Sequence, residues 1–158
     1  MRGFSAIGLD NPKCPANVGG VLRAAGCYGT AMVAMSGHRM RRVPTDVKKQ
    51  WRITPVIETE DLRLVIPYSC VPVAVDLIDG AKSIVSYTHP ERAFYIFGAE
   101  DSTLGQRVLG WCRDVIYVPT NSCMNLAATV NVVLYDRIMK MGGDAVRQQF
   151  NPPITNKD

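Results

Sequence analysis

Strand-like apolar runs alternate with helix-like segments along most of this 158-residue chain. The runs predict strands at residues 4–9, 31–35, 71–75, 94–97 and 115–118. Such alternation is typical of an α/β fold with a mostly parallel sheet and helices on both faces, because each crossover between parallel strands passes over the sheet. With no internal repeat and no linker, the sequence predicts one domain over residues 1–158, of which 151–158 form a loose polar tail.

Helical periodicity marks the segments between the runs. Residues 16–28 share one apolar face, and Gly29 follows in the position expected for a left-handed helix end. A longer helix is expected from Cys123 to Met141, with Gly142 and Gly143 as its stop. Shorter helices are expected at 45–52, at 59–65 with Thr59 as the N-cap, and at 102–111.

Hydropathy and cysteine content limit the classes of protein to which this chain can belong. No apolar stretch approaches the ~20 residues that a membrane helix needs, and the first residues lack the build of a signal peptide, so we expect a cytoplasmic protein. The five cysteines are odd in number and none forms a C-x-x-C pair, which favours buried small apolar residues over a disulfide framework or a zinc site. No metal is expected. Neither His38 nor His89 has a partner pattern that suggests a ligand or a base.

The net charge of +4 is unevenly distributed. Residues 38–52 hold six of the eighteen basic residues, opposed only by Asp46, with Trp51 among them. One interpretation is a solvated loop and helix, and the other is a patch that binds phosphate groups with salt-dependent affinity. The candidate residues of this patch are Arg39, Arg41, Arg42, Lys48, Lys49 and Arg52.

The first helix carries an unusual second face. Gly19, Arg23 and Gly26 follow at i, i+4 and i+7, and Gly20 is adjacent. Each glycine costs a helix roughly 1 kcal/mol relative to alanine, so this set predicts the close approach of a ligand or of another helix. Arg23 then projects from the middle of the contact face. The alternative is an exposed arginine on a poor helix. Asn17 stands at the helix entrance, where its side chain can fix the turn.

Two further turns carry polar residues at junctions of strand and helix. Gly98 and Glu100 directly follow a strand, where a glycine lets the backbone approach a flat ligand and a glutamate can hold a hydroxyl or orient a cation. A turn glycine with a solvated glutamate is the commoner meaning of this pair. Asn121 or Ser122 is expected to cap the last helix. Asn125 is expected one turn inside that helix, where asparagine is less easily explained.

Together, these segments resemble the SpoU/TrmH branch of the SPOUT class of RNA methyltransferases. That family shows N-x-G-x-x-x-R-x-A, then F-G-x-E, then I-P and S-L-N at the head of a long helix that ends in L-Y-E. The matching residues are Asn17-Val18-Gly19 with Arg23-Ala24, Phe97-Gly98-Ala99-Glu100, Val118-Pro119, Cys123-Met124-Asn125 and Leu134-Tyr135-Asp136. Order and spacing match from residue 6 to about residue 137.

Two departures from the family pattern lie in one loop. The segment between Pro119 and Asn125 is shorter than in most relatives. The position of the family serine is held by Cys123, with Ser122 beside it, so either residue can take the part of that serine.

The resemblance implies a trefoil-knotted α/β fold and a homodimer with its site at the interface, although knots are rare on general grounds. It also implies S-adenosylmethionine as methyl donor, S-adenosylhomocysteine as product, and 2′-O-methylation of a ribose in RNA. Since no additional N-terminal RNA-binding domain is evident, the chain is similar to the minimal members that act on tRNA, including those that modify the anticodon wobble position. We therefore expect tRNA ahead of rRNA. The alternatives are a non-catalytic RNA-binding module of the same fold and a cysteine enzyme that uses Cys123.

The resemblance also assigns roles to residues. Because arginine resists deprotonation, our hypothesis is that Arg23 binds the target phosphate and stabilises the developing alkoxide, while Glu100 and Asn17 orient it and Asn125 completes the catalytic set. The cofactor is expected to lie mainly on backbone groups of three loops. Its candidate residues are Leu77, Gly98, Ile116, Val118, Pro119, Ser122, Cys123 and Asn125.

Overall fold

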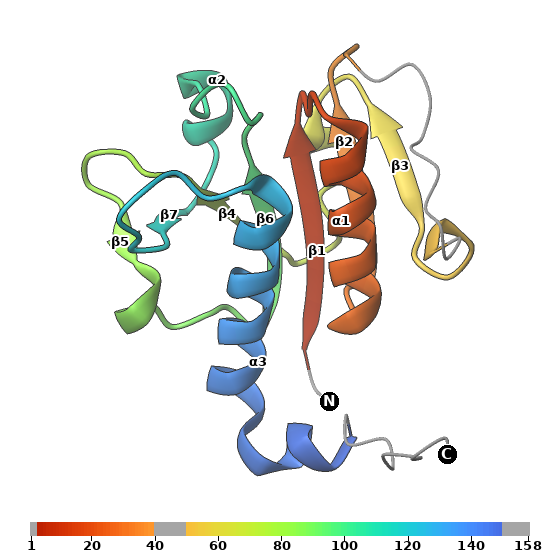
Figure 1. Cartoon of the computed structure of the whole chain (residues 1–158), viewed down its shortest axis with the longest axis vertical. Helices are drawn as coiled ribbons and strands as arrows, with labels where there is room; N and C mark the ends of the chain where they lie inside the picture. The colour runs from red at the N-terminus through yellow and green to blue at the C-terminus, as the bar shows by residue number, and fades with distance from the viewer. Residues whose placement is uncertain (1–2, 40–49, 150–158) are drawn as a thin grey trace.

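The computed structural model describes residues 3–39 and 50–149. Its centre is a seven-stranded sheet in the order β3-β2-β1-β6-β4-β7-β5, in which every neighbouring pair runs parallel (Figure 1). The strands are β1 (Phe4–Asp10), β2 (Val33–Ser36), β3 (Val56–Thr59), β4 (Val71–Val75), β5 (Lys82–Ser83), β6 (Arg92–Phe97) and β7 (Asp114–Tyr117). The helices are α1 (Pro15–Cys27), α2 (Gln106–Leu109) and α3 (Leu126–Gln149), with 3-10 turns η1 (Gln50–Arg52), η2 (Leu62–Val65) and η3 (Ile84–Ser86). The predicted parallel α/β architecture is confirmed.

The core lies on both faces of the sheet. Along β6, Tyr95 and Phe97 belong to the cluster on one face, whereas Phe94 and Ile96 belong to the cluster on the other. The helices α1 and α3 lie side by side over the first face (Figure 1), and η2 and α2 contribute to the second. Because the central strands are buried on both faces, they appear in the sequence as continuous apolar runs.

Several element boundaries differ from the predictions. The strands β3 and β5 are missing from the predicted set, and the helix predicted at 59–65 is reduced to η2. Thr59 ends β3 instead of capping a helix, and Asp61 is the cap, because its Oδ1 accepts from the backbone N–H of Arg63 at 2.9 Å. The helix predicted at 102–111 is the single turn α2.

The last helix was predicted with both ends wrong. It begins at Leu126, because the side-chain oxygen of Asn125 accepts from the backbone N–H groups of Ala127 at 2.9 Å and Ala128 at 3.2 Å. Asn125 is therefore the N-cap, in place of Asn121 or Ser122. The helix continues to Gln149 through Gly142 and Gly143. Most of the helix predicted at 45–52 and the whole of the tail predicted at 151–158 lie outside the described residues.

The glycines of α1 have separate explanations. A Cβ built on Gly20 would lie 2.7 Å from the Cβ of Ala127 on α3, so Gly20 allows the two helices to approach. A Cβ on Gly19 would meet nothing within 4 Å. The predicted close approach of another helix is confirmed at Gly20, whereas Gly19 meets no atom of the described residues.

This contrast gives a matched pair of variants. Gly20→Ala is expected to lower the free energy of unfolding by about 1–3 kcal/mol, because the new methyl group overpacks the α1–α3 contact. Gly19→Ala, one residue away, is expected to raise it by up to about 1 kcal/mol, because alanine favours the helix and meets no atom. Urea unfolding of both variants measures the difference. Equal effects would show that the α1–α3 contact is not as close as Gly20 indicates.

A buried polar network anchors α3 to the sheet. The His89 side chain is fully buried, with Nδ1 2.6 Å from the hydroxyl of Tyr95 and Nε2 2.7 Å from Oδ2 of Asp136. Arg137 donates to the same hydroxyl at 3.2 Å. If the Tyr95 hydroxyl donates to Nδ1 and Nε2–H donates to Asp136, every group has a partner only while the imidazole is neutral. His89, which the sequence left without a role, thus links the Leu134-Tyr135-Asp136 motif to the sheet.

This network predicts a pH dependence of folding. Burial lowers the pKa of His89, Arg137 and Lys140 act in the same direction, and Asp136 opposes them. The neutral imidazole therefore stabilises the fold above the unfolded pKa of about 6.5, and this contribution is lost as the pH falls through the lowered folded pKa. His89→Gln is expected to flatten the fall in stability between neutral and mildly acidic pH, measured by urea unfolding. His38→Gln, at an exposed site, is the control, and an unchanged slope in His89→Gln would contradict the assignment.

Candidate active site

Three loops lie at the end of the sheet where the strands have their carboxyl ends. The strands β6, β4 and β7 are neighbours and run parallel, so the loops at 98–105, 76–81 and 118–125 all begin at this end (Figure 1). In parallel α/β sheets, ligands bind beyond the carboxyl ends of the strands. The cofactor candidates predicted from the sequence lie in these loops or at the strand ends that lead into them.

Asp76 links the loop after β4 to the loop after β6 and to strand β7, and the sequence analysis missed it. Its backbone N–H donates to the carbonyl of Ile116 at 2.9 Å, and its Oδ2 accepts from the backbone N–H of Leu104 at 2.6 Å. Its Oδ1 accepts from the backbone N–H of Leu77 at 2.8 Å. The signal for Asp76 was an aspartate directly after a buried parallel strand, which is a common place for a functional or loop-fixing side chain.

Glu100 fastens the loop after β6 to the start of α1. Its Oε2 accepts from the backbone N–H of Lys13 at 2.9 Å. Its Oε1 accepts from the backbone N–H of Cys14 at 3.2 Å and from Nδ2 of Asn17 at 2.8 Å. Backbone N–H groups around a helix start lack intrahelical acceptors and favour a negative charge. Glu100 therefore satisfies donors from a segment more than eighty residues away.

These donors keep Glu100 ionised. Burial alone raises the pKa of Glu100, but hydrogen bonds from Asn17, from its own backbone and from the backbone of Lys13 and Cys14 outweigh burial and lower the pKa. A carboxylate with a lowered pKa and occupied oxygens is a poor proton acceptor. Its contribution to folding is present above the unfolded pKa and is lost as the pH falls through the folded pKa. The geometry suits a positioning role.

Asn17 connects Glu100 to Asn125. A carboxylate only accepts, so Nδ2 of Asn17 faces Glu100, and Oδ1 of Asn17 accepts from Nδ2 of Asn125 at 2.6 Å. The remaining oxygen of Asn125 is then free to cap α3. One directional chain of hydrogen bonds thus joins the loop after β6, the head of α1 and the head of α3. Three of the four predicted catalytic residues are brought together.

Arg23 lies away from this chain of hydrogen bonds. It is exposed on α1, six residues beyond Asn17, which corresponds to about 9 Å along the helix axis and about a third of a turn around it. Within the described part of the chain, its guanidinium forms no hydrogen bond or ion pair. The predicted orientation of Arg23 by Glu100 and Asn17 therefore has no counterpart among the described contacts of a single chain.

Three cofactor candidates differ in accessibility. Leu77 is 70% exposed in the loop after β4. Ile116 is fully buried in the core, and its carbonyl is bound by Asp76. A Cβ on Gly98 would lie 3.2 Å from the carbonyl oxygen of Ser102, so the turn of its own loop already accounts for this glycine.

The remaining candidates follow β7 along the chain. Val118 is partly buried against the core, whereas Pro119, Ser122 and Cys123 are exposed in the loop before α3. The carbonyl of Ser122 accepts from the hydroxyl of Thr120 at 2.8 Å, which tightens this short loop. The side chains of Ser122 and Cys123 are equally available, so the position of the family serine is open to either.

The predicted RNA-binding segment is described only at its two ends. Arg39 pairs with Asp101 at 2.8 Å, and the guanidinium of Arg52 lies 5.4 Å from the ring centre of Trp51, which is 48% exposed. The other candidates, Arg41, Arg42, Lys48 and Lys49, lie outside the described residues.

The described residues contain neither a cluster of metal ligands nor a helix that could span a membrane. Over residues 3–39 and 50–149, no three histidine, cysteine or acidic side chains gather as a metal site would require. None of the helices in the same ranges combines the length and apolar character needed to cross a bilayer. All five cysteines are free, and none is fully buried: Cys14, Cys70 and Cys112 are half-buried, and Cys27 and Cys123 are exposed. The interpretation of the cysteines as buried residues is therefore wrong.

Solved structures share this fold at low sequence identity. AviRb from Streptomyces viridochromogenes, a SpoU methyltransferase in complex with AdoMet, is 18% identical with a TM-score of 0.74, over 96% of this chain and 63% of its own. An AdoMet-bound rRNA methyltransferase from Sinorhizobium meliloti is 18% identical with a TM-score of 0.77, over 89% and 58%. A structure described by the 2-OH methylation of C/U34 on tRNA is 18% identical with a TM-score of 0.75, over 90% and 99%. The chain thus spans less than two thirds of the first two.

These likenesses show the fold and agree with the predicted SPOUT architecture, while the trefoil knot stays a prediction. None of the curated proteins compared with the chain matches it in sequence. The profile of the SpoU rRNA Methylase family matches residues 5–135, which include all the motif residues except Asp136 and most of the sheet. The chain belongs to the SpoU rRNA methylase family.

Proposed function

We propose that this chain is an S-adenosylmethionine-dependent RNA methyltransferase that methylates the 2′-hydroxyl of a ribose in tRNA. The observation that carries the proposal is the hydrogen-bond chain from Glu100 through Asn17 to Asn125, which locks three motif segments at the carboxyl edge of the sheet. Membership of the SpoU family supports RNA methylation as the reaction class. The alternative function is that of a non-catalytic RNA-binding module with the same fold.

The three loops fit S-adenosylmethionine. Leu77 in the loop after β4 and Pro119 in the loop after β7 are exposed apolar side chains, which suit contact with the flat faces of adenine. The cofactor, when bound, supplies a methyl group on a positively charged sulfur. Two of the similar structures hold AdoMet, which supports this assignment. The residues proposed to hold it are Leu77, Gly98, Ile116, Val118, Pro119, Ser122, Cys123 and Asn125.

The proposed reaction depends more on the positioning of the two reactants than on acid–base catalysis. A bond forms between the ribose 2′ oxygen and the methyl carbon, the carbon–sulfur bond breaks, and the hydroxyl proton passes to water. Holding the two reactants in line can supply several kcal/mol of the barrier. Because arginine is a poor general base, the proposed role of Arg23 is to bind a substrate phosphate and to stabilise the charge that develops on the oxygen. Asn17 and Glu100 hold the loops in place.

A homodimer would bring Arg23 to the loops. On α1, a Cβ at Gly19 would meet no atom of the described residues within 4 Å, and Arg23, one turn further on, is exposed. On α3, Val132, Tyr135 and Met139 form an exposed stripe at helical spacing, with exposed fractions of 37%, 56% and 38%. Both helices cover the same face of the sheet, so a second copy can pack there in two-fold symmetry. We propose that Arg23 of one copy completes the site of the other.

One of the similar structures favours tRNA as the substrate. The structure described by the 2-OH methylation of C/U34 on tRNA is matched over 99% of its length, whereas the rRNA methyltransferase is matched over 58%. Nearly every part of the first structure thus has a counterpart in the present chain. We propose tRNA as the substrate and the wobble nucleotide as the first position to examine, with rRNA as the second candidate.

One experiment tests the reaction, the atom and the RNA together. The pure protein is incubated with labelled S-adenosylmethionine and with unmodified total tRNA or rRNA, and the label is located by nucleoside mass spectrometry. We expect 2′-O-methylnucleosides in the tRNA sample. Label on a base would contradict the ribose assignment, and label only in rRNA would contradict the tRNA assignment. RNA binding without any transfer would favour the non-catalytic module.

A further inference from the structure

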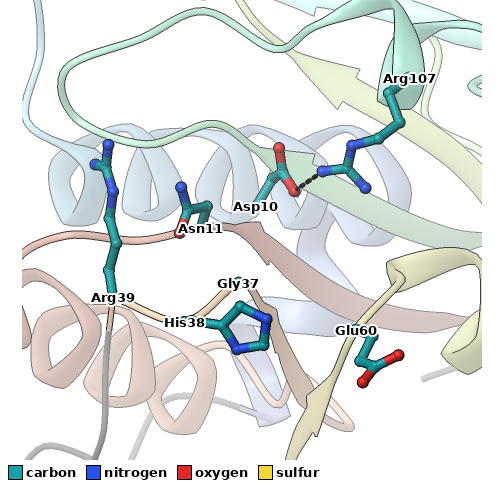
Figure 2. A pocket seen from close by; sticks show the side chains of 7 residues that line it. All are labelled: Asp10, Asn11, Gly37, His38, Arg39, Glu60 and Arg107. Carbon is teal, nitrogen blue, oxygen red and sulfur yellow. Dashed lines mark hydrogen bonds and ion pairs between the residues drawn. The ribbon is translucent and has the colours of Figure 1, made fainter.

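A polar hollow, separate from the candidate active site, lies beside it. It has a volume of about 470 Å³ and opens at the carboxyl ends of β1, β2 and β3. Figure 2 shows Asn11 and His38 beside the hollow, with Arg39 and Arg107 at opposite ends of it. The roles proposed for the methyl transfer use none of these side chains except Arg39, which belongs to the RNA-binding candidates. The lining residues are Asp10, Asn11, Gly37, His38, Arg39, Glu60 and Arg107.

The floor of the hollow is made by two strand ends that turn in the left-handed region. Asn11 follows β1 with φ 53° and Gly37 follows β2 with φ 89°, and the backbone N–H of Asn11 donates to the carbonyl of Ser36 at 3.0 Å. A Cβ on Gly37 would lie 2.3 Å from Oδ1 of Asn11, so only glycine fits there. Backbone of this kind is costly for asparagine and often occurs at functional sites.

The charges of the hollow are balanced. Arg107 pairs with Asp10 at 2.8 Å, and Asp10 also accepts from the hydroxyl of Ser36 at 2.8 Å. Arg39 pairs with Asp101 at 2.8 Å, and Glu60 adds a further carboxylate. A bare phosphate would meet these carboxylates and be repelled. Donors and acceptors placed side by side suit a neutral, flat group that has both, such as a nucleobase.

The loop after β6 connects the hollow to the active site. Glu100 and Asp101 are consecutive on this loop, and Lys13 contacts both, through its backbone N–H to Glu100 and through its ammonium to Asp101 at 3.3 Å. Glu100 belongs to the hydrogen-bond chain of the active site, whereas Asp101 pairs with Arg39, which lines the hollow. We therefore expect one RNA strand to contact both places.

We propose that this hollow binds an unpaired nucleobase of the substrate RNA and sets the sequence preference of the enzyme. Arg107, Asp10 and Glu60 supply hydrogen bonds to the edge of the base, and the exposed ring of His38 supplies a stacking surface. The proposal rests on the proposed function, because it assigns a base of the same RNA whose ribose is methylated.

The test uses nucleoside 5′-monophosphates as probes. The full chain, labelled with ¹⁵N, is titrated with AMP, CMP, GMP and UMP in turn, and with inorganic phosphate as a separate arm. We expect the backbone signals of Asn11 and Gly37 to shift with a clear preference among the four bases, and inorganic phosphate to shift them weakly. Arg107→Gln is expected to weaken the preferred nucleotide roughly tenfold, as the loss of a good base contact does.

Arg113→Gln is the matched control. Arg113 has one carboxylate partner, Asp114, and its side chain is 56% exposed, against 60% for Arg107, but it lies at the amino end of β7. It is expected to bind nucleotides like the unmodified chain. Equal binding of all four nucleotides, an equal effect of inorganic phosphate, no shift at all, or unchanged affinity in Arg107→Gln would each overturn the proposal.

Methyl transfer to tRNA separates this inference from the proposed function. If the chain methylates RNA but binds no nucleotide at the hollow, only the base site is wrong. If a nucleotide binds at the hollow but no RNA is methylated, the base site stands as an RNA-binding site and the proposed enzymatic function is wrong.

Discussion

Arg23→Ala is expected to reduce the kcat for RNA methylation by about 10²–10³-fold, with little change in the affinity for S-adenosylmethionine. Losses of this size follow the removal of one group that stabilises a developing oxyanion. Arg23 is exposed and has no partner among the described residues, so its removal leaves no buried group unsatisfied and should not unfold the chain. Single-turnover methylation of tRNA and calorimetric binding of the cofactor measure the two quantities.

Arg23→Lys tests which property of the arginine matters. Lysine keeps the positive charge but loses the planar fork that binds a phosphate through two parallel hydrogen bonds. We expect this variant to recover only a small part of the lost rate. Near-full activity in Arg23→Lys would contradict bidentate phosphate binding, and near-full activity in Arg23→Ala would remove Arg23 from the catalytic set.

Arg137→Met is expected to lower the free energy of unfolding by about 3–5 kcal/mol, because it breaks a buried network from one side. Arg137 is 6% exposed and donates to the carbonyls of Pro90 and Glu91, both at 2.6 Å, and to that of Phe4 at 3.3 Å. Methionine fills much of the volume but removes the donor to the carbonyl of Pro90 and one of the two donors to that of Glu91, which still accepts from the backbone N–H of Phe4 at 2.9 Å. Urea unfolding of the variant measures the loss.

Arg92→Met is the control for Arg137→Met. Arg92 also donates to a backbone carbonyl, that of Tyr68, at 3.0 and 3.1 Å, and its guanidinium lies over the ring of Phe4. Its hydrogen bonds lie in an exposed setting, where water can replace the lost donor, so we expect a loss of no more than about 1 kcal/mol. A similar loss in the two variants would show that burial of the Arg137 network contributes little.

The central strands were predictable because burial determines their sequence. In β1, β4 and β6, buried apolar residues face both sides of the sheet, and the resulting runs are hard to mistake. The strand β3 lies at the sheet edge and is only half buried, so Val56–Thr59 has no such run. Thr59, followed by two acidic residues, has the composition of a helix start, and local sequence alone could not distinguish the two.

The candidate site was predictable in part. The motif residues Asn17, Glu100 and Asn125 were named from the resemblance, and the structure brings them into one hydrogen-bond chain. The role of Asn125 as the N-cap of α3 was missed. Its side-chain oxygen faces α3 because its side-chain nitrogen binds Asn17, and local sequence does not show this long-range contact. Asp76 was missed because a single aspartate after a strand is a weak signal. Arg23 has no partner among the described residues, and the partner that we propose for it belongs to a second copy of the chain, which the sequence of one chain cannot position.

Mixed dimers test most directly whether one copy of the chain completes the site of the other. Arg23→Ala chains are mixed with Asn125→Ala chains, the dimers are allowed to exchange, and methylation of tRNA is measured before and after exchange. Each variant alone is expected to be nearly inactive. After exchange we expect about a quarter of the unmodified activity, because half of the dimers are mixed and each mixed dimer has one intact site. No recovery after verified exchange would contradict the shared site and place Arg23 with the loops of its own chain or outside the site altogether.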